Sequence, residues 1–306
     1  MHCGVRRFAC TACGKCCNRS PEVELSEAAA LADVFVFRLM FRLYSLPRTF
    51  ESSRSPYENA ETFYQKKRLL AAHAARKYPQ KIMQDGHRVE RTQYLMISAL
   101  ALDTRSGACA ALSDGRCGIY DRRPLGCRTV PFHYSRADAL AERDLDAFVA
   151  TPGYACDAGE GAPVVVESGR IVDRLTLQTR EEALALARRD LPWKQAIVRR
   201  MKASLSAESP LPSLDEVKAN AAFGAMTTSM RVGWEIAAEA GLISTNECKA
   251  LIAAQAILIE REFVAGKCPK DAHETLADMR GEYASHIGDG WLTGTPFSGA
   301  APLMSA

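Results

Sequence analysis

The 306-residue chain has no long uninterrupted hydrophobic run. Its longest apolar stretch, residues 34–46, is interrupted by Arg38 and Arg42 and is shorter than the roughly 20 residues that cross a bilayer. Residues 1–20 contain charged and cysteine side chains where an export signal would have an apolar segment. We therefore expect a cytoplasmic protein without a membrane span.

Two other features are missing, and each narrows the range of functions. No glycine-rich loop follows a predicted strand, so the sequence does not favour a Rossmann-type cofactor site. The net charge is only +3, with 25% charged residues, and does not indicate a nucleic-acid partner. The sequence alone identifies no catalytic residue and no residue that binds an organic cofactor.

Cysteine, in contrast, is abundant and unevenly distributed. Nine of the eleven cysteines precede residue 157, and four of them lie in the CxxCxxCC stretch from Cys10 to Cys17. Two cysteines separated by two residues can turn both sulfurs toward one metal ion. Cytosolic thiols are kept reduced, and the adjacent Cys16 and Cys17 suit disulfides poorly. The stretch therefore predicts metal binding.

The predicted metal ligands are the eight cysteines that stand in or after this stretch in the first half of the chain: Cys10, Cys13, Cys16, Cys17, Cys109, Cys117, Cys127 and Cys156. Eight thiolates fit two four-thiolate sites, or one cluster plus one further site. Side chains alternate in an extended segment, so Cys17 is expected to point away from Cys16 and to serve a different site. Cys248 and Cys268 are expected to be core residues, and Cys3 is either a spare ligand or part of a frayed terminus.

The identity of the metal stays open at this point. Cysteines that repeat every three residues, as Cys10, Cys13 and Cys16 do, can hold three corners of a [4Fe–4S] cluster with a distant cysteine as the fourth ligand. Zinc needs only four thiolates at tetrahedral spacing. Both metals accept soft sulfur ligands, so zinc and an iron–sulfur cluster remain alternatives.

Three other residues are expected to surround the ligands. Arg123 and Arg128 flank Cys127 and are predicted to donate hydrogen bonds to the sulfurs and offset their negative charge. The alternative for Arg123 is a surface ion pair, for instance with Asp121. Tyr120 is predicted to pack beside the site with a hydrogen-bonded hydroxyl. His133 is not favoured as a ligand, because eight thiolates already suffice.

Taken together, these residues resemble the YkgJ-type cysteine-cluster family over residues 8–157. The likeness rests on a spaced pattern that reads Cys10-x-x-Cys13-Gly14-x-Cys16-Cys17, then Cys109, then Cys117-x-Ile119-Tyr120-x-x-Arg123-Pro124-x-x-Cys127-Arg128-x-x-Pro131. Val130 departs from it, because an aromatic residue is common there. The resemblance implies a zinc- or iron-chelating domain. Relatives of this family include flagellin lysine N-methylases, so the resemblance also implies an iron–sulfur cluster used with S-adenosylmethionine.

Three functional hypotheses follow. The first is a metal-binding cysteine-cluster protein of unassigned activity, whose helical region docks a protein partner. The second, which rests on the resemblance, is an iron–sulfur-dependent protein lysine N-methyltransferase that acts on a protein substrate. The third is a structural zinc module, which chelators would unfold. Whether the protein is an enzyme stays open.

The expected fold is α+β, with a small cysteine-rich module of short strands followed by a mainly helical C-terminal region. We place the cysteine-cluster domain at residues 1–175, the helical region at 176–286 and an irregular tail at 287–306. The pattern of apolar and capping residues predicts strands or a hairpin at 89–102 and 164–172, and helices at 26–46, 55–78, 180–190, 192–205, 213–240, 244–265 and 269–286.

Overall fold

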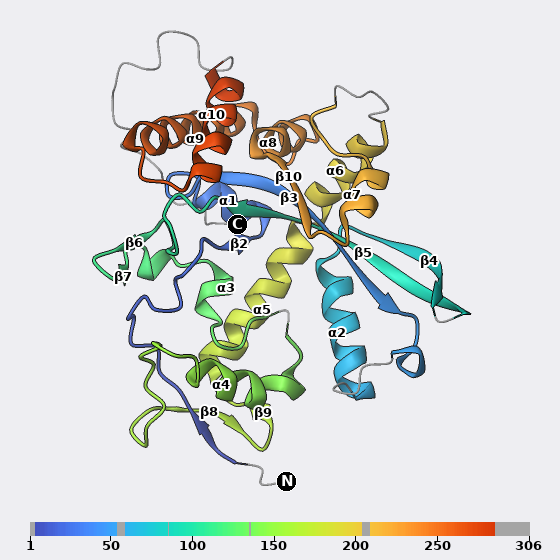
Figure 1. The fold of residues 1–306 in the computed structure, drawn as a ribbon, viewed down its shortest axis with the longest axis vertical. Helices are drawn as coiled ribbons and strands as arrows, with labels where there is room; N and C mark the ends of the chain where they lie inside the picture. Colours follow the sequence, from blue (N-terminus) through green and yellow to red (C-terminus); the bar gives the residue numbers. More distant parts are fainter. Residues whose placement is uncertain (1–3, 54–58, 85, 135, 204–208, 285–306) are drawn as a thin grey trace.

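The computed structural model describes residues 4–53, 59–84, 86–134, 136–203 and 209–284. Within them the fold is α+β with antiparallel sheets, as predicted. Figure 1 shows the C-terminal helices above a long sheet, and a second, small sheet at the other end, near the N-terminus. The predicted tail at 287–306 lies outside the described residues.

The central sheet is built on two long strands, β3 (Phe37–Pro47) and β5 (His87–Ala101). They pair antiparallel from Phe37 opposite Ala101 to Pro47 opposite Arg91. Short strands β10 (Ala225–Ser229) and β2 (Glu22–Val23) extend the sheet in the order β10-β3-β5-β2, and β4 (Arg76–Gln84) forms a hairpin with β5. Every pairing is therefore antiparallel.

The main hydrophobic core lies between this sheet and the helices packed against it. These helices are α1 (Leu25–Ala30), α6 (Leu191–Ala203), α7 (Leu214–Asn220), α8 (Met230–Glu239), α9 (Thr245–Ala265) and α10 (Lys270–Ala284). Phe37 and Leu39 of β3 are fully buried in the same cluster as Trp234 of α8 and Leu276 of α10. The C-terminal helices thus share one core with the first half of the chain, and the predicted domain boundaries stay a prediction.

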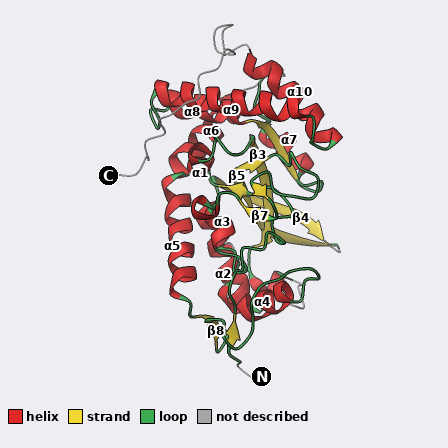
Figure 2. Ribbon diagram, turned by 90° about the vertical axis from the view of Figure 1, so that its left-hand side faces the viewer, coloured by secondary structure: helices red, strands yellow, loops and turns green. Residues whose placement is uncertain are grey.

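A smaller core lies at the opposite end. Strands β1 (Arg6–Arg7), β8 (Val164–Glu167) and β9 (Arg170–Ile171) form a three-stranded sheet that packs with η3 (Asp138–Leu140) and α4 (Ala141–Val149). Helix α5 (Arg174–Arg189) runs from this sheet along one side of the molecule to α6 (Figure 2). The two cores are therefore joined by one long helix and by the loops that carry the cysteines.

The segment between β3 and β4 contains η1 (Phe50–Ser52) and α2 (Ala60–His73), which begins after the capping residue Asn59. After β5 the chain forms the hairpin of β6 (Leu112–Ser113) and β7 (Arg116–Cys117), then η2 (Tyr120–Arg122) and α3 (Leu125–Arg128). These last four short elements contain two of the predicted ligands, Cys117 and Cys127.

A buried ionic cluster fastens α1, α2 and α6 to one another. Lys194 of α6, 1% exposed, places its Nζ 2.5 Å from Glu24 Oε2, just before α1, and donates a hydrogen bond of 3.2 Å to the carbonyl of His73. Glu24 Oε1 lies 3.1 Å from His73 Nδ1. Buried charges are tolerated in proteins when they are paired in this way.

Several predicted elements are confirmed, and three are wrong. The strand at 89–102, the hairpin at 164–172 and the helices of the last third correspond to β5, β8–β9, α9 and α10, and the predicted helices 180–190 and 192–205 lie in α5 and α6. The predicted helix 26–46 ends at Ala30, and its second half is β3. The predicted helix 55–78 ends at His73 and is followed by β4, and helix 213–240 is split by β10.

No helix in the described ranges is both long enough and apolar enough to cross a membrane. Cys248 is buried in the main core and Cys268 packs against it, as predicted. Cys3 lies outside the described residues.

Candidate metal centre

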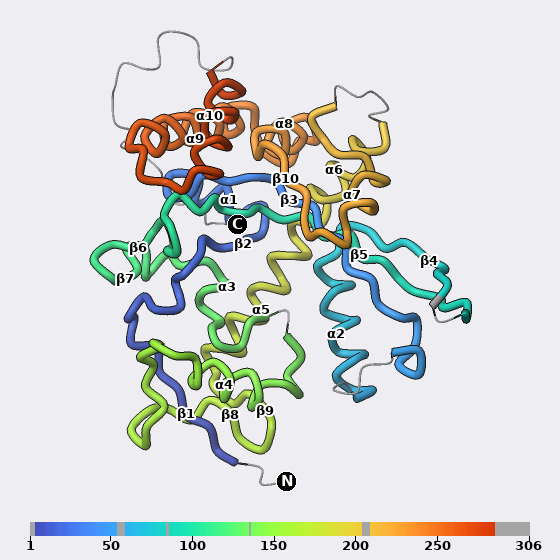
Figure 3. Tube along the Cα trace, viewed as in Figure 1, coloured from blue at the N-terminus to red at the C-terminus, as the bar shows by residue number. Residues whose placement is uncertain are grey.

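The CxxCxxCC loop lies where two segments from far along the chain meet it. At its start, Ala9 and Asp157 exchange backbone hydrogen bonds of 2.7 and 3.1 Å, which sets Cys10 beside Cys156. Thr11 Oγ1 donates to the carbonyl of Ala155 at 2.8 Å. In Figure 3 the N-terminal segment runs upward from β1, past these loops, to β2.

The loop turns tightly instead of staying extended. The amide of Cys17 donates a 3.0 Å hydrogen bond to the carbonyl of Gly14, which closes a turn. Gly14 has φ +67°, and a Cβ there would lie 2.4 Å from the carbonyl oxygen of Gly115 in the β6–β7 turn. Only glycine combines this backbone conformation with so close an approach. The loop is thus pressed against the hairpin that carries Cys117.

The end of the loop meets the second half of the ligand set. The amide of Cys109 donates a 2.8 Å hydrogen bond to the carbonyl of Cys17. Cys117 ends strand β7, opposite Leu112. Cys127 lies within the one-turn helix α3. This helix begins directly after Pro124, whose ring fixes the φ angle at the start of the helix.

The electrostatic interactions among the thiols separate them into two groups. Burial, and then the charges of Cys13, Cys16 and Cys10, raise the pKa of the Cys156 thiol to about 11. We call these four residues the Cys156 group. It also packs against the smaller core, through Cys156.

The other four residues, Cys17, Cys109, Cys117 and Cys127, form the Cys127 group. Burial, followed by the charges of Cys109, Cys117 and Glu27, raises the pKa of Cys127 to about 12. Burial also raises the pKa of Cys109, with a further contribution from Cys117. Cys109 packs against the main core. Each group therefore lies at the edge of a different core.

Cys16 and Cys17 join the two groups. A hydrogen bond between their side chains is the largest cause that lowers the pKa of Cys16, to about 6, and it raises the pKa of Cys17. Cys17 also interacts with the charges of Cys109 and Cys117. The turn brings the two thiols together, so the expectation that they point apart is wrong, although their other neighbours do lie in different groups.

All ten described cysteines are free thiols. Among the described residues, no three Cys, His, Asp or Glu side chains are arranged as the ligands of one metal ion. The chain thus gathers the thiols into two neighbourhoods, without forming a finished coordination shell. Four thiolates in each neighbourhood are a donor set that suits zinc or an iron–sulfur cluster.

The two arginines beside Cys127 differ in their contacts. Arg123 lies over the ring of Tyr120, with its Cζ 3.7 Å from the ring centroid, and its charge lowers the pKa of both Cys16 and Cys127. Arg128 instead forms a 3.0 Å ion pair with Glu182 of α5. Arg123 is therefore the arginine whose charge acts on both groups, and its stacking on Tyr120 replaces the alternative pair with Asp121.

One known family matches this part of the chain. Residues 9–156 match the family described as "CxxCxxCC: Putative zinc- or iron-chelating domain". The match includes all eight predicted ligands and confirms the family expected from the cysteine pattern. No curated protein and no solved structure matches the chain.

Sequence reasoning missed one residue that holds the CxxCxxCC domain together. Glu27 of α1 is mostly buried, and its Oε1 accepts a 2.7 Å hydrogen bond from the amide of Leu125, the first residue of α3. Its Oε2 accepts from the amide of Glu24 at 3.4 Å. Burial raises the pKa of Glu27. The sequence places Glu27 in the first turn of a predicted helix, but this position does not indicate a contact with α3.

His133 lies on the other side of α3. Its Nε2 would be 3.3 Å from a Cβ at Gly126, and its ring stacks on Tyr134 with 4.2 Å between centroids. Burial and nearby positive charges lower the pKa of His133 to about 4. A neutral imidazole packed behind the helix accords with the expectation that His133 is not a ligand, which stays a prediction.

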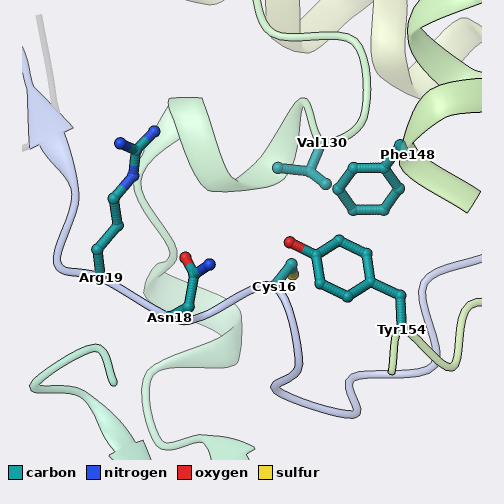
Figure 4. Close-up of a pocket in the computed structure, with 6 residues that line it drawn as sticks. All are labelled: Cys16, Asn18, Arg19, Val130, Phe148 and Tyr154. Carbon is teal, nitrogen blue, oxygen red and sulfur yellow. The ribbon is translucent and has the colours of Figure 1, made fainter. Parts of the chain in front are cut away.

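A surface pocket of about 400 Å³ opens beside the Cys156 group. Figure 4 shows Cys16 at its centre, with Asn18 and Arg19 on one side and Val130, Phe148 and Tyr154 on the other. The pocket therefore combines a thiol, a guanidinium and an amide with an apolar wall. This pocket thus adjoins the Cys156 group.

Proposed function

We propose that this protein binds metal at two four-thiolate sites, one in the Cys156 group and one in the Cys127 group. The observation that supports it is the separation of the eight thiols into two sets of four neighbours, both inside the segment that matches a zinc- or iron-chelating family. Without a metal, the Cys156 and Cys127 thiols resist ionisation, because burial and then the charges of neighbouring thiols raise their pKa values. A bound cation offsets the free-energy cost of ionising these thiols, because it binds the thiolate form of each ligand.

The ligand spacing differs between the two groups, and this guides the choice of metal. The Cys156 group contains the three regularly spaced cysteines of the loop and one distant cysteine, which is the donor pattern of a [4Fe–4S] cluster. The Cys127 group lacks that regular spacing and supplies four thiolates, which is a donor set that a tetrahedral zinc site uses. We therefore propose an iron–sulfur cluster for the first group and zinc, or a second iron site, for the other.

Metal at either site would tie together segments that are distant in sequence. The Cys156 group joins the N-terminal loop to the segment after α4, and the Cys127 group joins it to the β6–β7 hairpin and α3. Binding would therefore contribute directly to the folding free energy of this half of the chain. An iron–sulfur cluster would add one-electron chemistry.

The experiment is an anaerobic purification followed by a visible spectrum and by measurement of iron, zinc and acid-labile sulfide. Broad absorbance, with iron and sulfide in equal amounts and zinc present, is the expected result. A colourless protein with stoichiometric zinc and no sulfide would reject the iron–sulfur cluster and leave two zinc sites. A protein that retains no metal while all its thiols stay reduced would reject the proposal as a whole.

The protein lysine N-methyltransferase alternative is a second proposal, favoured by one feature, the pocket beside Cys16. Its Arg19 and Asn18 offer hydrogen-bond donors, and Phe148 and Tyr154 offer aromatic surface, so it suits a small ligand with both polar and apolar parts. Calorimetry of the metal-loaded protein with S-adenosylmethionine tests it. Binding that the Arg19→Ala variant weakens would support this alternative, and an absence of binding with the metal in place would reject it.

A further inference from the structure

A second concave surface lies far from the cysteines, between α2 and the β4–β5 hairpin. It has a volume of about 470 Å³, comparable to pockets that bind small ligands. One wall is a single face of α2, because its lining residues Tyr64, Lys67 and Arg68 are spaced by three or four positions. The other wall is one face of the hairpin, where Lys77 lies directly opposite Tyr94. We call this surface the α2–hairpin groove.

The charge around the groove is strongly positive. Residues 48–91, which run from η1 through α2 and β4 into the start of β5, contain ten Lys or Arg and five Asp or Glu. This segment therefore has a net charge of +5, whereas the whole chain has +3, so the remainder of the chain has −2. The basic residues are concentrated in the one segment that separates the first cysteine cluster from the second.

Two of the cations in the groove are not neutralised within the described part of the chain. Arg68 and Lys77 are both exposed, and neither has an ion-pair partner there. Lys67 differs, because its Nζ donates a 2.5 Å hydrogen bond to the carbonyl of Arg48. Of the nearby acids, Glu90 already pairs with Arg48 at 2.6 Å and with Lys81 at 3.9 Å. Positive charge in the groove is thus available to a partner.

We propose that the α2–hairpin groove docks an acidic segment of a partner protein. Charge complementarity supports an acidic occupant, because carboxylates would pair with Arg68 and Lys77 while their stems pack on Ala71 and Tyr64. A nucleic acid fits less well. Tyr64 is the one aromatic ring at the groove that is well exposed, so there is no row of rings on which bases would stack.

This docking surface is independent of the metal sites. The experiment measures fluorescence anisotropy of a labelled poly-glutamate peptide with the full-length, metal-loaded protein at several salt concentrations. We expect binding that weakens as salt rises, because surface charges are screened. In the double variant Arg68→Glu, Lys77→Glu the affinity should fall about tenfold or more, because like charges then face each other.

A matched control separates this site from general electrostatic attraction. Lys249→Glu, Lys267→Glu makes the same change in net charge at two exposed positions of the C-terminal region and should bind the peptide as the wild type does. Arg68→Ala, Lys77→Ala provides a milder pair in case charge reversal disturbs folding, and it should weaken binding less. Circular dichroism and metal content confirm that each variant is folded.

Three results would overturn the proposal. One is an absence of peptide binding at low salt. Another is an equal loss of affinity in the groove variant and the control. The third is tighter binding of an oligothymidylate than of the peptide, lost in the groove variant, which would identify the groove as a nucleic-acid site.

Discussion

The backbone amide of Cys109 donates a 2.8 Å hydrogen bond to the carbonyl of Cys17, so the last residue of the CxxCxxCC loop touches the first cysteine of the second half of the ligand set. The contact lies within the Cys127 group, directly after Cys16 of the Cys156 group. The CxxCxxCC loop therefore contributes thiols to both groups, three to one and one to the other. The predictions below test what this arrangement implies for metal retention and stability.

Gly14→Ala should loosen the loop. A Cβ at this position would lie 2.4 Å from the Gly115 carbonyl oxygen, and the backbone has φ +67°. We expect faster loss of metal to a chelator and a lower Tm. Gly115→Ala is the control, because Gly115 has φ +74° but nothing within 4 Å of its Cβ position. It carries only the backbone cost, about 1 kcal/mol. Equal metal loss in both variants would show that the close approach is unimportant.

Arg123 and Arg128 should differ in their effect on metal release. Arg123→Gln removes the charge that lowers the pKa of Cys16 and Cys127, so protons compete better for the thiolates. The pH at which half of the metal is released should rise by about a few tenths of a unit. Arg128→Gln should leave that pH unchanged, because Arg128 pairs with Glu182. A larger shift for Arg128 would contradict the assignment. Metal release during a pH titration gives both values.

Lys194→Met should destabilise the whole protein. Lys194 is 1% exposed, and its removal leaves the buried Glu24 carboxylate with only His73 as its partner. Loss of one member of a buried pair costs about 3–5 kcal/mol. The exposed pair of Arg200 and Glu239 supplies the control, since Arg200→Met should cost less than about 1 kcal/mol. Denaturant unfolding measures both, and similar values would mean that the buried cluster does not bear on stability.

The same cluster makes stability depend on pH. Burial alone would raise the pKa of Glu24, but its hydrogen bond with His73 and the charge of Lys194 outweigh burial and hold the pKa below its ordinary value. A group whose pKa is lower in the folded state stabilises the protein above its unfolded pKa, about 4.3, and loses that contribution as the pH falls through the folded pKa. The advantage of the wild type over Glu24→Gln should therefore shrink in acid.

Glu27 and Asp190 contribute to the pH dependence of stability with the opposite sign. Burial raises the pKa of each, so their ionised forms destabilise the folded protein and this cost is lost in acid. Both are present in the wild type and in Glu24→Gln, and the charge of Glu24 contributes to raising the pKa of each, so the difference between the two proteins reports Glu24 together with its coupling to them. Unfolding free energies from pH 7 down to the acid limit of folding supply the comparison. A difference that stays constant with pH would mean that Glu24 is not ionised in the folded protein.

The sequence predicted the secondary structure well where local patterns determine it. It did so poorly where pairing with a distant strand determines it. In the segment 37–47, Phe37, Leu39 and Phe41 alternate with other side chains, yet Met40 between them is also fully buried, so the apolar run resembles a buried helix. Strand β10 is likewise set by its partner β3, which lies far away in the sequence. Pro79 lies within β4, which pairs in the described structure only with β5 and so tolerates a residue without an amide hydrogen.

The eight candidate ligands could be identified from spacing, but their division could not. Cys156 joins Cys10 through the bridge between Ala9 and Asp157, and no local pattern in the sequence encodes that bridge. The closeness of Cys16 and Cys17 follows from the turn at Gly14, where the extended geometry assumed from the sequence does not hold. The contact of Glu27 with α3 is long-range for the same reason.

Native mass spectrometry of the anaerobically purified wild type, Cys156→Ala and Cys127→Ala tests the division into two sites most directly. The wild type should carry metal at both sites, Cys156→Ala should lose the metal of one site, and Cys127→Ala should lose that of the other, so that the two losses differ in mass or add up to the wild-type content. If both variants lose the same metal, or if either loses all of it, the eight thiolates form one site and the account is contradicted.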